Sequence, residues 1–238
     1  MNDAVEKVRK FYETFDFSKI ITNSPKQIQD FLDKENEWIR NHLWIGKNVL
    51  EIGCGYGRLT EKIASLAKSI AGIDYSLPLI EKSRISLVAL SNISLALMDA
   101  TELGFAKNIF GSVVCFNASF SNMPGIEIKV LREMKRVCKN GGEVIFSVLS
   151  EKAKKAQLEN YLRLGLKIIN QDKNSITTKE GLVSCRFSRK DLEFLLNRMK
   201  MEYEIIEFCS IGYLVIAKKR SDYYITSAFF YLKYAVFY

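Results

Sequence analysis

The chain has 238 residues, of which 48% are hydrophobic, so it can bury the core of one large domain and does not have the composition of a disordered protein. It carries 35 Lys and Arg against 27 Asp and Glu, which gives a formal net charge of +8. This excess is compatible with nucleic acid, an anionic membrane surface or an acidic small molecule as a partner, and the sign alone does not choose among them.

The first 46 residues predict two helices. Residues 2–17 have the pattern of a short helix. Ser24 and Pro25 then mark the start of a second helix, as its N-cap and its first helical residue. We expect residues 1–46 to form a helical cap in front of the main domain.

From Asn48 the chain alternates between short apolar runs and stretches with helical periodicity. Strands alternating with helices predict a mostly parallel sheet that is covered on both faces. Near the end, the runs EYEIIEFC and GYLVIAKK are separated by so short a link that they must form an antiparallel hairpin.

Three glycines, Gly53, Gly55 and Gly57, follow the first predicted strand at alternate positions, in VLEIGCGYGRLTEKIA. A backbone without Cβ atoms can turn sharply and approach a ligand closely. The spacing disfavours a dinucleotide site, whose third glycine would stand where this chain has Arg58. A P-loop is excluded, because no Gly-Lys-Ser/Thr follows at the required distance.

Four motifs in order resemble those of the class I, Rossmann-like S-adenosylmethionine (SAM) methyltransferases, over about residues 48–218. The acidic residue and G-x-G-x-G of the family's first motif are matched by Glu51-Ile52-Gly53-Cys54-Gly55-Tyr56-Gly57. Asp74 ends the second strand run and Asp99-Ala100 follow the third. The fourth match is CKNGGEVIF, in which Asn140 replaces the proline often found in the family.

The resemblance implies an α/β fold, a Rossmann-like three-layer sandwich with a mostly parallel seven-stranded sheet and an antiparallel strand in a C-terminal hairpin. Residues 47–220 would form the SAM-binding domain, with an insertion at about 151–190 as a lid over the substrate. SAM would be the cofactor and S-adenosylhomocysteine (SAH) the product, with no metal involved.

The resemblance also implies where SAM binds. The glycine turn would cradle its methionine part, Asp74 would accept hydrogen bonds from both ribose hydroxyls and Tyr75 would pack against the adenine. The Asp99 carboxylate would lie near the adenine amino group, and the Ala100 amide near a ring nitrogen. The expected cofactor-binding residues are Glu51, Gly53, Cys54, Gly55, Gly57, Asp74, Tyr75, Asp99, Ala100 and Asn117.

The methyl acceptor is less constrained by the motifs. The segment after the fourth strand, NASFSNM at 117–123, faces the transferred methyl group in this family, and it lacks the Asn/Asp-Pro-Pro-aromatic motif of enzymes that methylate exocyclic amines of bases. We expect Phe120 and Asn122 to contact the acceptor, together with Tyr12 and with Arg186, which suits an anionic substrate. Alternatively, 117–123 only shapes a loop, Tyr12 packs in the core and Arg186 lies at the surface.

These observations predict a SAM-dependent methyltransferase that acts on a small molecule, with no catalytic side chain identified. An RNA (tRNA) or protein methyltransferase is the alternative, because the net charge and the N-terminal helices could provide a docking face. A third hypothesis is an interaction protein that binds SAM without turnover.

The last 18 residues, 221–238, form a tail rich in aromatic residues. This tail is too short to span a bilayer, which needs about 20 apolar residues. We expect it to dock on its own domain or on a second subunit in a homodimer, with contact to a membrane surface as the alternative.

The cysteines and the single histidine bear on location and metal binding. Five cysteines are scattered without a C-x-x-C pair, which is typical of reduced thiols in a cytoplasmic protein. His42 has no cysteines at ligand spacing, so we expect no metal site. The charged N-terminus MNDAVEKVRK shows no signal peptide.

Overall fold

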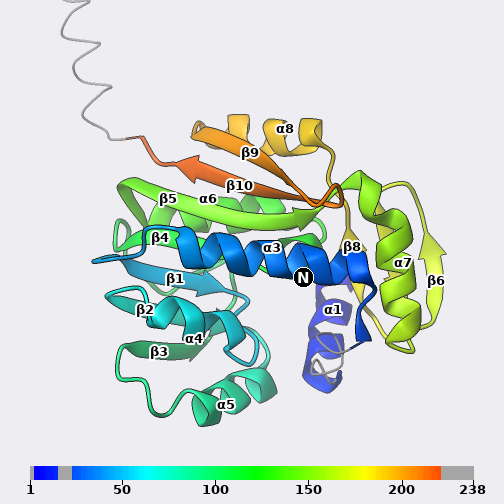
Figure 1. Cartoon of the computed structure of the whole chain (residues 1–238), viewed down its shortest axis with the longest axis horizontal. Helices are drawn as coiled ribbons and strands as arrows, with labels where there is room; N and C mark the ends of the chain where they lie inside the picture. Colours follow the sequence, from blue (N-terminus) through cyan, green and yellow to red (C-terminus); the bar gives the residue numbers. More distant parts are fainter. Residues whose placement is uncertain (1–2, 16–22, 221–238) are drawn as a thin grey trace, which may run out of the picture.

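Figure 1 shows the fold in the computed structural model, which describes residues 3–15 and 23–220. The predicted aromatic tail at 221–238 lies outside the described residues. The helices are α1 (Asp3–Thr14), α3 (Lys26–Asn41), α4 (Arg58–Ala64), α5 (Leu77–Ser86), η1 (Ser119–Asn122), α6 (Glu127–Val137), η2 (Glu151–Ala153), α7 (Lys154–Arg163) and α8 (Arg189–Met199). The strands are β1 (Asn48–Ile52), β2 (Ser69–Asp74), β3 (Ile93–Leu97), β4 (Phe110–Cys115), β5 (Cys138–Leu149), β6 (Ile168–Gln171), β7 (Ser175–Thr178), β8 (Val183–Cys185), β9 (Glu202–Phe208) and β10 (Gly212–Lys218).

A seven-stranded sheet with the order β3-β2-β1-β4-β5-β10-β9 forms the centre of the molecule (Figure 1). Neighbouring strands from β3 to β5 pair in parallel, whereas β10 pairs antiparallel with both β5 and β9. The predicted fold, including its closing hairpin, is therefore confirmed. The strand order reverses between β1 and β4, and open α/β sheets bind ligands at such a reversal.

Two apolar cores cover the two faces of the sheet, and alternate strand residues supply them. On β4, Val113 belongs to the core that includes α6 and α8, whereas the next residue, Val114, belongs to the core that includes α3 and α4. Because successive side chains of a strand point to opposite faces, a run buried on both sides reads as continuously apolar. This produces the three layers expected from the sequence.

Two local details differ from the expectations. Pro25, not Ser24, is the N-cap of α3, and the Ser24 hydroxyl instead donates to Asn160 Oδ1 of α7 at 2.7 Å. A long-range hydrogen bond has thus replaced the local cap. Strand β5 begins at Cys138 and includes the Gly141-Gly142 pair of the CKNGGEVIF motif, although two adjacent glycines are typical of a turn, and its register against β4 shifts between Phe110 and Ser112.

The insertion after β5 folds as α7 followed by a small antiparallel sheet, with the order β6-β7-β8. Ser188 and Asp191 form a capping box at the start of the next helix, α8. Figure 1 shows α1, α7 and the small sheet together beyond the ends at which the parallel strand arrows point. These elements therefore face the carboxyl ends of the parallel strands.

Within the described ranges, no helix is both long enough and apolar enough to cross a membrane.

Candidate active site

A hollow with a volume of about 170 Å³ lies where the strand order reverses. We call it the main hollow. Several of its residues come from the ends of β1 and β2 and from the turns after β1, β2 and β4, and we call these the sheet-end wall. The sheet-end wall includes Glu51, Gly53, Cys54, Gly55, Asp74, Tyr75, Asn117, Ala118 and Ser119. A volume this large has room for a small organic ligand rather than a single water.

The opposite side of the main hollow, which we call the lid wall, comes from the N-terminal helices and the insertion. The N-terminal segment contributes Phe11, Tyr12, Phe15, Ile28, Phe31 and Leu32. The insertion contributes Asn160, Tyr161, Leu164, Leu166, Leu182 and Ser184. None of these described lid-wall residues carries a charge.

The glycine turn has the backbone that its sequence predicts. Gly53 and Gly55 have φ values of 72° and 55°, in the left-handed region that glycine tolerates. A Cβ on Gly55 would have no protein atom within 4 Å, so the space in front of this residue is open to a ligand. Gly57 differs, because it is the N-cap of α4 and lines neither this hollow nor the neighbouring one. A Cβ there would stand 2.5 Å from Ser83 Oγ.

Asp74 fixes the glycine turn and retains capacity for a ligand. Its Oδ2 accepts from the Gly55 N–H and its Oδ1 from the Ser76 N–H, both at 2.9 Å. A carboxylate offers about four lone-pair sites, so both oxygens can accept once more. Burial raises the pKa of Asp74, and the backbone donors oppose that effect. Two neighbouring hydroxyl groups of a ligand could fill these remaining acceptor sites.

Glu51 is a buried carboxyl group on the sheet-end wall. Its Oε2 accepts from the Thr60 hydroxyl at 2.6 Å. Burial raises its pKa to about 7, although the Thr60 hydrogen bond and Arg58 act in the opposite direction. Near neutral pH this group is therefore present in both its charged and its neutral form.

The turn after β4 is held in an unusual conformation by a residue from α3. Asn117 and Ala118 both have positive φ, 58° and 52°, which costs energy for residues other than glycine. Glu35 Oε1 accepts from the Asn117 N–H at 2.8 Å and from the Ser147 hydroxyl at 2.6 Å. Ser147 Oγ in turn accepts from the Ala118 N–H at 3.2 Å. Glu35 thus anchors one part of the sheet-end wall.

Asp99 and Ala100 line a second hollow, not the main one. The two hollows share Tyr75, Asn122 and Met123 as lining residues, so they lie next to each other. The expected adenine contacts therefore fall in a compartment beside the expected ribose and methionine contacts.

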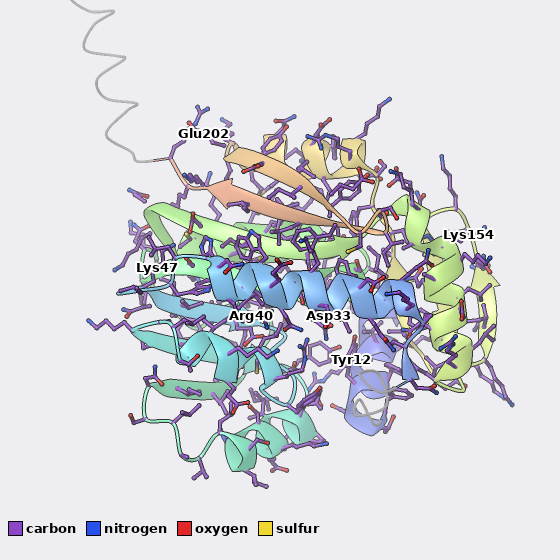
Figure 2. The ribbon with its side chains drawn as sticks, in the orientation of Figure 1. Tyr12, Asp33, Arg40, Lys47, Lys154 and Glu202 are labelled. Atoms are coloured by element: carbon purple, nitrogen blue, oxygen red, sulfur yellow. The ribbon has the colours of Figure 1, made fainter. Side chains whose placement is uncertain are left out.

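Tyr12 brings α1 against the sheet ends (Figure 2). Its phenolic oxygen accepts from Asn122 Nδ2 at 2.6 Å, and its ring meets that of Tyr75 edge-on, with 6.0 Å between centroids. Burial, followed by Tyr161 and Asp74, raises the pKa of Tyr12 well above its usual range. Asn122 Oδ1 is buried without a hydrogen-bond partner among the described residues, which is the kind of acceptor that a ligand donor would satisfy.

Two residues expected to contact the acceptor lie elsewhere. Phe120 is fully buried and packs against Phe146 and Phe187, because η1 turns it back into the core. Arg186 is 2% exposed, lines neither hollow and donates to Gln157 Oε1 and to backbone carbonyl groups. Both expectations are corrected here: Phe120 belongs to the core and Arg186 to the inside of the insertion.

Sequence reasoning missed Glu35, Tyr161 and Ser184. Glu35 could have been found, because it lies on the apolar stripe of α3 at a position where a core residue is expected. Tyr161 and Ser184 carried no local signal, since they reach the main hollow only through the packing of the insertion.

The described residues include no group of three or more His, Cys, Asp or Glu side chains placed to hold a metal ion. The polar groups of the two hollows instead fit SAM, because Gly55 leaves open space, Asp74 has spare acceptor sites and Asn122 Oδ1 lacks a donor.

Comparison with known proteins finds methyltransferases both among family models and among individual relatives. Residues 49–142 match a family model described as a methyltransferase domain. The ubiquinone biosynthesis O-methyltransferase of Nitrosococcus oceani is 27% identical over 82% of this chain and 87% of its own length. The phosphatidylethanolamine N-methyltransferase of Cereibacter sphaeroides is 37% identical over 42% of this chain, and the match spans only 49% of that relative.

A solved structure supports the fold over a longer stretch. The 1,6-didemethyltoxoflavin-N1-methyltransferase of Burkholderia thailandensis, solved with 1,6-didemethyltoxoflavin and SAH bound, superposes with a TM-score of 0.64 at 14% identity. The superposition covers 92% of this chain and 88% of that one.

Proposed function

This chain belongs to the class I SAM-dependent methyltransferases, and on that premise we propose that it transfers the methyl group of SAM to a small-molecule acceptor and releases SAH. The proposal rests on one observation: two walls of different chemistry face each other across the main hollow. The sheet-end wall has hydrogen-bonding groups suited to SAM, and the lid wall has an apolar surface suited to an organic acceptor.

The residues that would hold SAM are those of the sheet-end wall and the second hollow. Asp74 would bind the ribose hydroxyls, and the turn at Gly53 and Gly55 would accommodate the methionine part. Asp99 and Ala100 would contact the adenine in the second hollow, with Tyr75 packed beside it. Glu51, when ionised, would attract the positive charges of the cofactor.

SAM, when bound, supplies an electrophilic methyl group on a positively charged sulfur. The chain then has to hold the acceptor atom close and in line, and positioning of this kind can provide much of a methyltransferase's rate. Tyr12 and Asn122 lie between the two walls and would help to exclude water from the reacting atoms. No general base is assigned.

A small molecule is favoured over RNA or protein by the lid wall. Helices α1, α3 and α7 all contribute residues to the main hollow, which leaves the sheet ends covered. The proteins compared above also carry names of small-molecule methyltransferases. The acceptors in these names differ from one another.

The test is SAH formation by purified protein with SAM and three groups of acceptors: neutral phenols and quinols, small amines, and macromolecules (tRNA and basic peptides). We expect turnover with small molecules only, and loss of that turnover in Asp74→Asn. Turnover restricted to tRNA or peptide would replace the proposal with the macromolecular alternative. Tight SAM binding with no turnover across all three groups would favour an interaction protein.

A further inference from the structure

Four buried polar side chains of the insertion form one hydrogen-bonded chain behind the lid wall. Arg186 donates to Gln157 Oε1, and Gln157 Nε2 donates to Ser184 Oγ at 2.9 Å and to the Tyr161 phenolic oxygen at 3.4 Å. Gln157, Ser184 and Arg186 are each at most 2% exposed, and Tyr161 is 7% exposed. Tyr161 and Ser184, at the end of this chain, line the main hollow.

Arg186 sets the direction of donation along this series of hydrogen bonds. A guanidinium can only donate, so the Gln157 amide must present its oxygen to Arg186 and its nitrogen to the two hydroxyls. Three backbone carbonyl groups, those of Asp172, Lys173 and Ser175, hold the other guanidinium nitrogen of Arg186. The Gln157 amide therefore cannot reverse without placing its NH2 donor against the Arg186 donor and leaving both unpaired.

Counting protons leaves one donor for a ligand. The oxygens of Ser184 and Tyr161 both accept from Gln157, so each hydroxyl still has its own proton to donate. A hydrogen bond between the two hydroxyls would use only one of these protons. No hydrogen bond among the described residues takes the other, and both hydroxyls lie at the surface of the main hollow.

Charged residues of α7 lie on its outer face. Lys154 and Lys155 are exposed, and Arg163 pairs with Glu159 at the surface (Figure 2 labels Lys154). The buried face of α7 carries Ala156, Gln157, Asn160 and Tyr161. In a protein with a net charge of +8, the described lid wall offers no ion-pair partner to an acceptor.

We propose that the methyl acceptor is an uncharged molecule with a largely apolar, ring-sized body and an oxygen atom that accepts a hydrogen bond from the Tyr161–Ser184 pair. The charged residues of the main hollow, Glu51, Arg58 and Asp74, lie on the side of the sheet ends, so a charged group placed against the lid wall would lose its hydration without an opposite charge on that wall. A purely apolar molecule would leave the hydroxyl proton unpaired. This inference rests on the proposed function, since it concerns the acceptor of the same reaction.

The test uses four probes with the same ring system and different head groups: naphthol, naphthoate, naphthylmethylamine and methylnaphthalene. Binding of each to the full chain saturated with SAH is measured by calorimetry at neutral pH. We expect naphthol to bind about tenfold more tightly than each of the other three. Tyr161→Phe combined with Ser184→Ala should reduce that preference over methylnaphthalene to about twofold or less, because it removes both hydroxyl protons of the pair.

Tyr203→Phe is the matched control, because Tyr203 lies on β9 outside both hollows and donates to Asn197 Oδ1. This variant should keep the full preference for naphthol. Equal or tighter binding of naphthoate or the amine by the unaltered chain would overturn the inference, as would binding of none of the probes. The comparison of probes in the unaltered chain stands even if the variant that combines Tyr161→Phe with Ser184→Ala does not fold. Absence of SAH binding would instead overturn the proposed function.

Discussion

The two walls of the main hollow are built in different ways. The sheet-end wall comes from short turns at the ends of neighbouring strands, and backbone conformation and backbone N–H groups set its geometry, as at Gly55 and Asp74. The lid wall comes from segments more than a hundred residues apart, and side-chain contacts such as that of Ser24 with Asn160 hold it together. Backbone geometry suits a cofactor that is always the same molecule. Side chains can be replaced without changing the fold, so the lid wall can differ between proteins that act on different acceptors.

The largest expected effect separates two glycines of one motif. In Gly57→Ala, the new Cβ would collide with Ser83 and Leu87 at a φ of 89°, so the free energy of unfolding should fall by about 2 to 4 kcal/mol. In Gly55→Ala no atom is near, so unfolding should change by only about 1 to 2 kcal/mol, while SAM binding is lost because the methyl group fills the cradle. Denaturant unfolding and calorimetry separate the two outcomes, and equal effects on stability would contradict this view of the turn.

The second prediction concerns Asp74→Asn, which keeps the shape of the side chain but removes its charge. The affinity for both SAM and SAH should fall by about 10- to 100-fold, because a charge-assisted hydrogen bond to the ribose is lost. Asp172→Asn, on the exposed part of the insertion, is the control and should leave both affinities unchanged. Unchanged binding in Asp74→Asn would remove Asp74 from the cofactor site.

The third prediction concerns the pH dependence caused by Glu51, whose pKa is raised from 4.5 to about 7 by burial. The folded state disfavours the ionised form of Glu51. The stability that neutral Glu51 contributes is therefore fully present below pH 4.5, the pKa of Glu51 in the unfolded chain, and is lost as the pH rises through its folded pKa of about 7. Glu51→Gln should therefore be more stable than the unaltered chain by about 1 to 3 kcal/mol at about pH 8, and equally stable at about pH 4.

The same substitution should have the opposite effect on the cofactor. In the unaltered chain, SAM affinity should rise as the pH increases through about 7, because ionised Glu51 attracts the positive charges of SAM. In Glu51→Gln this rise should be absent. Calorimetric titrations at several pH values provide the measurement, and a parallel rise in both proteins would assign the effect to another group.

The smallest expected effect is at the junction of the two walls. Tyr12→Phe removes the oxygen that accepts from Asn122, so the free energy of unfolding should decrease by about 1 kcal/mol. SAH affinity should change by less than about threefold, because Tyr12 acts on the hollow mainly through its ring. A loss of SAH affinity as large as that expected for Asp74→Asn would mean that the Tyr12 hydroxyl takes part in binding the cofactor.

The contrast between the walls also explains what the sequence could predict. The alternation of apolar runs and helical patterns was sufficient for the sheet and its closing hairpin, and the glycine turn lies where its spacing placed it. Both depend on local chemistry. Phe120 and Arg186 were assigned to the acceptor from their position in the chain, but η1 and the hydrogen bonds of the insertion direct them inward. Such long-range packing leaves no periodic signal in one sequence.

The most direct test of the account is a set of calorimetric titrations of the purified full chain with SAM, SAH and NADH. We expect micromolar binding of SAM and SAH and no binding of NADH, because the glycine spacing disfavours a dinucleotide site. Binding of NADH without any response to SAM or SAH would contradict the assignment of the sheet-end wall.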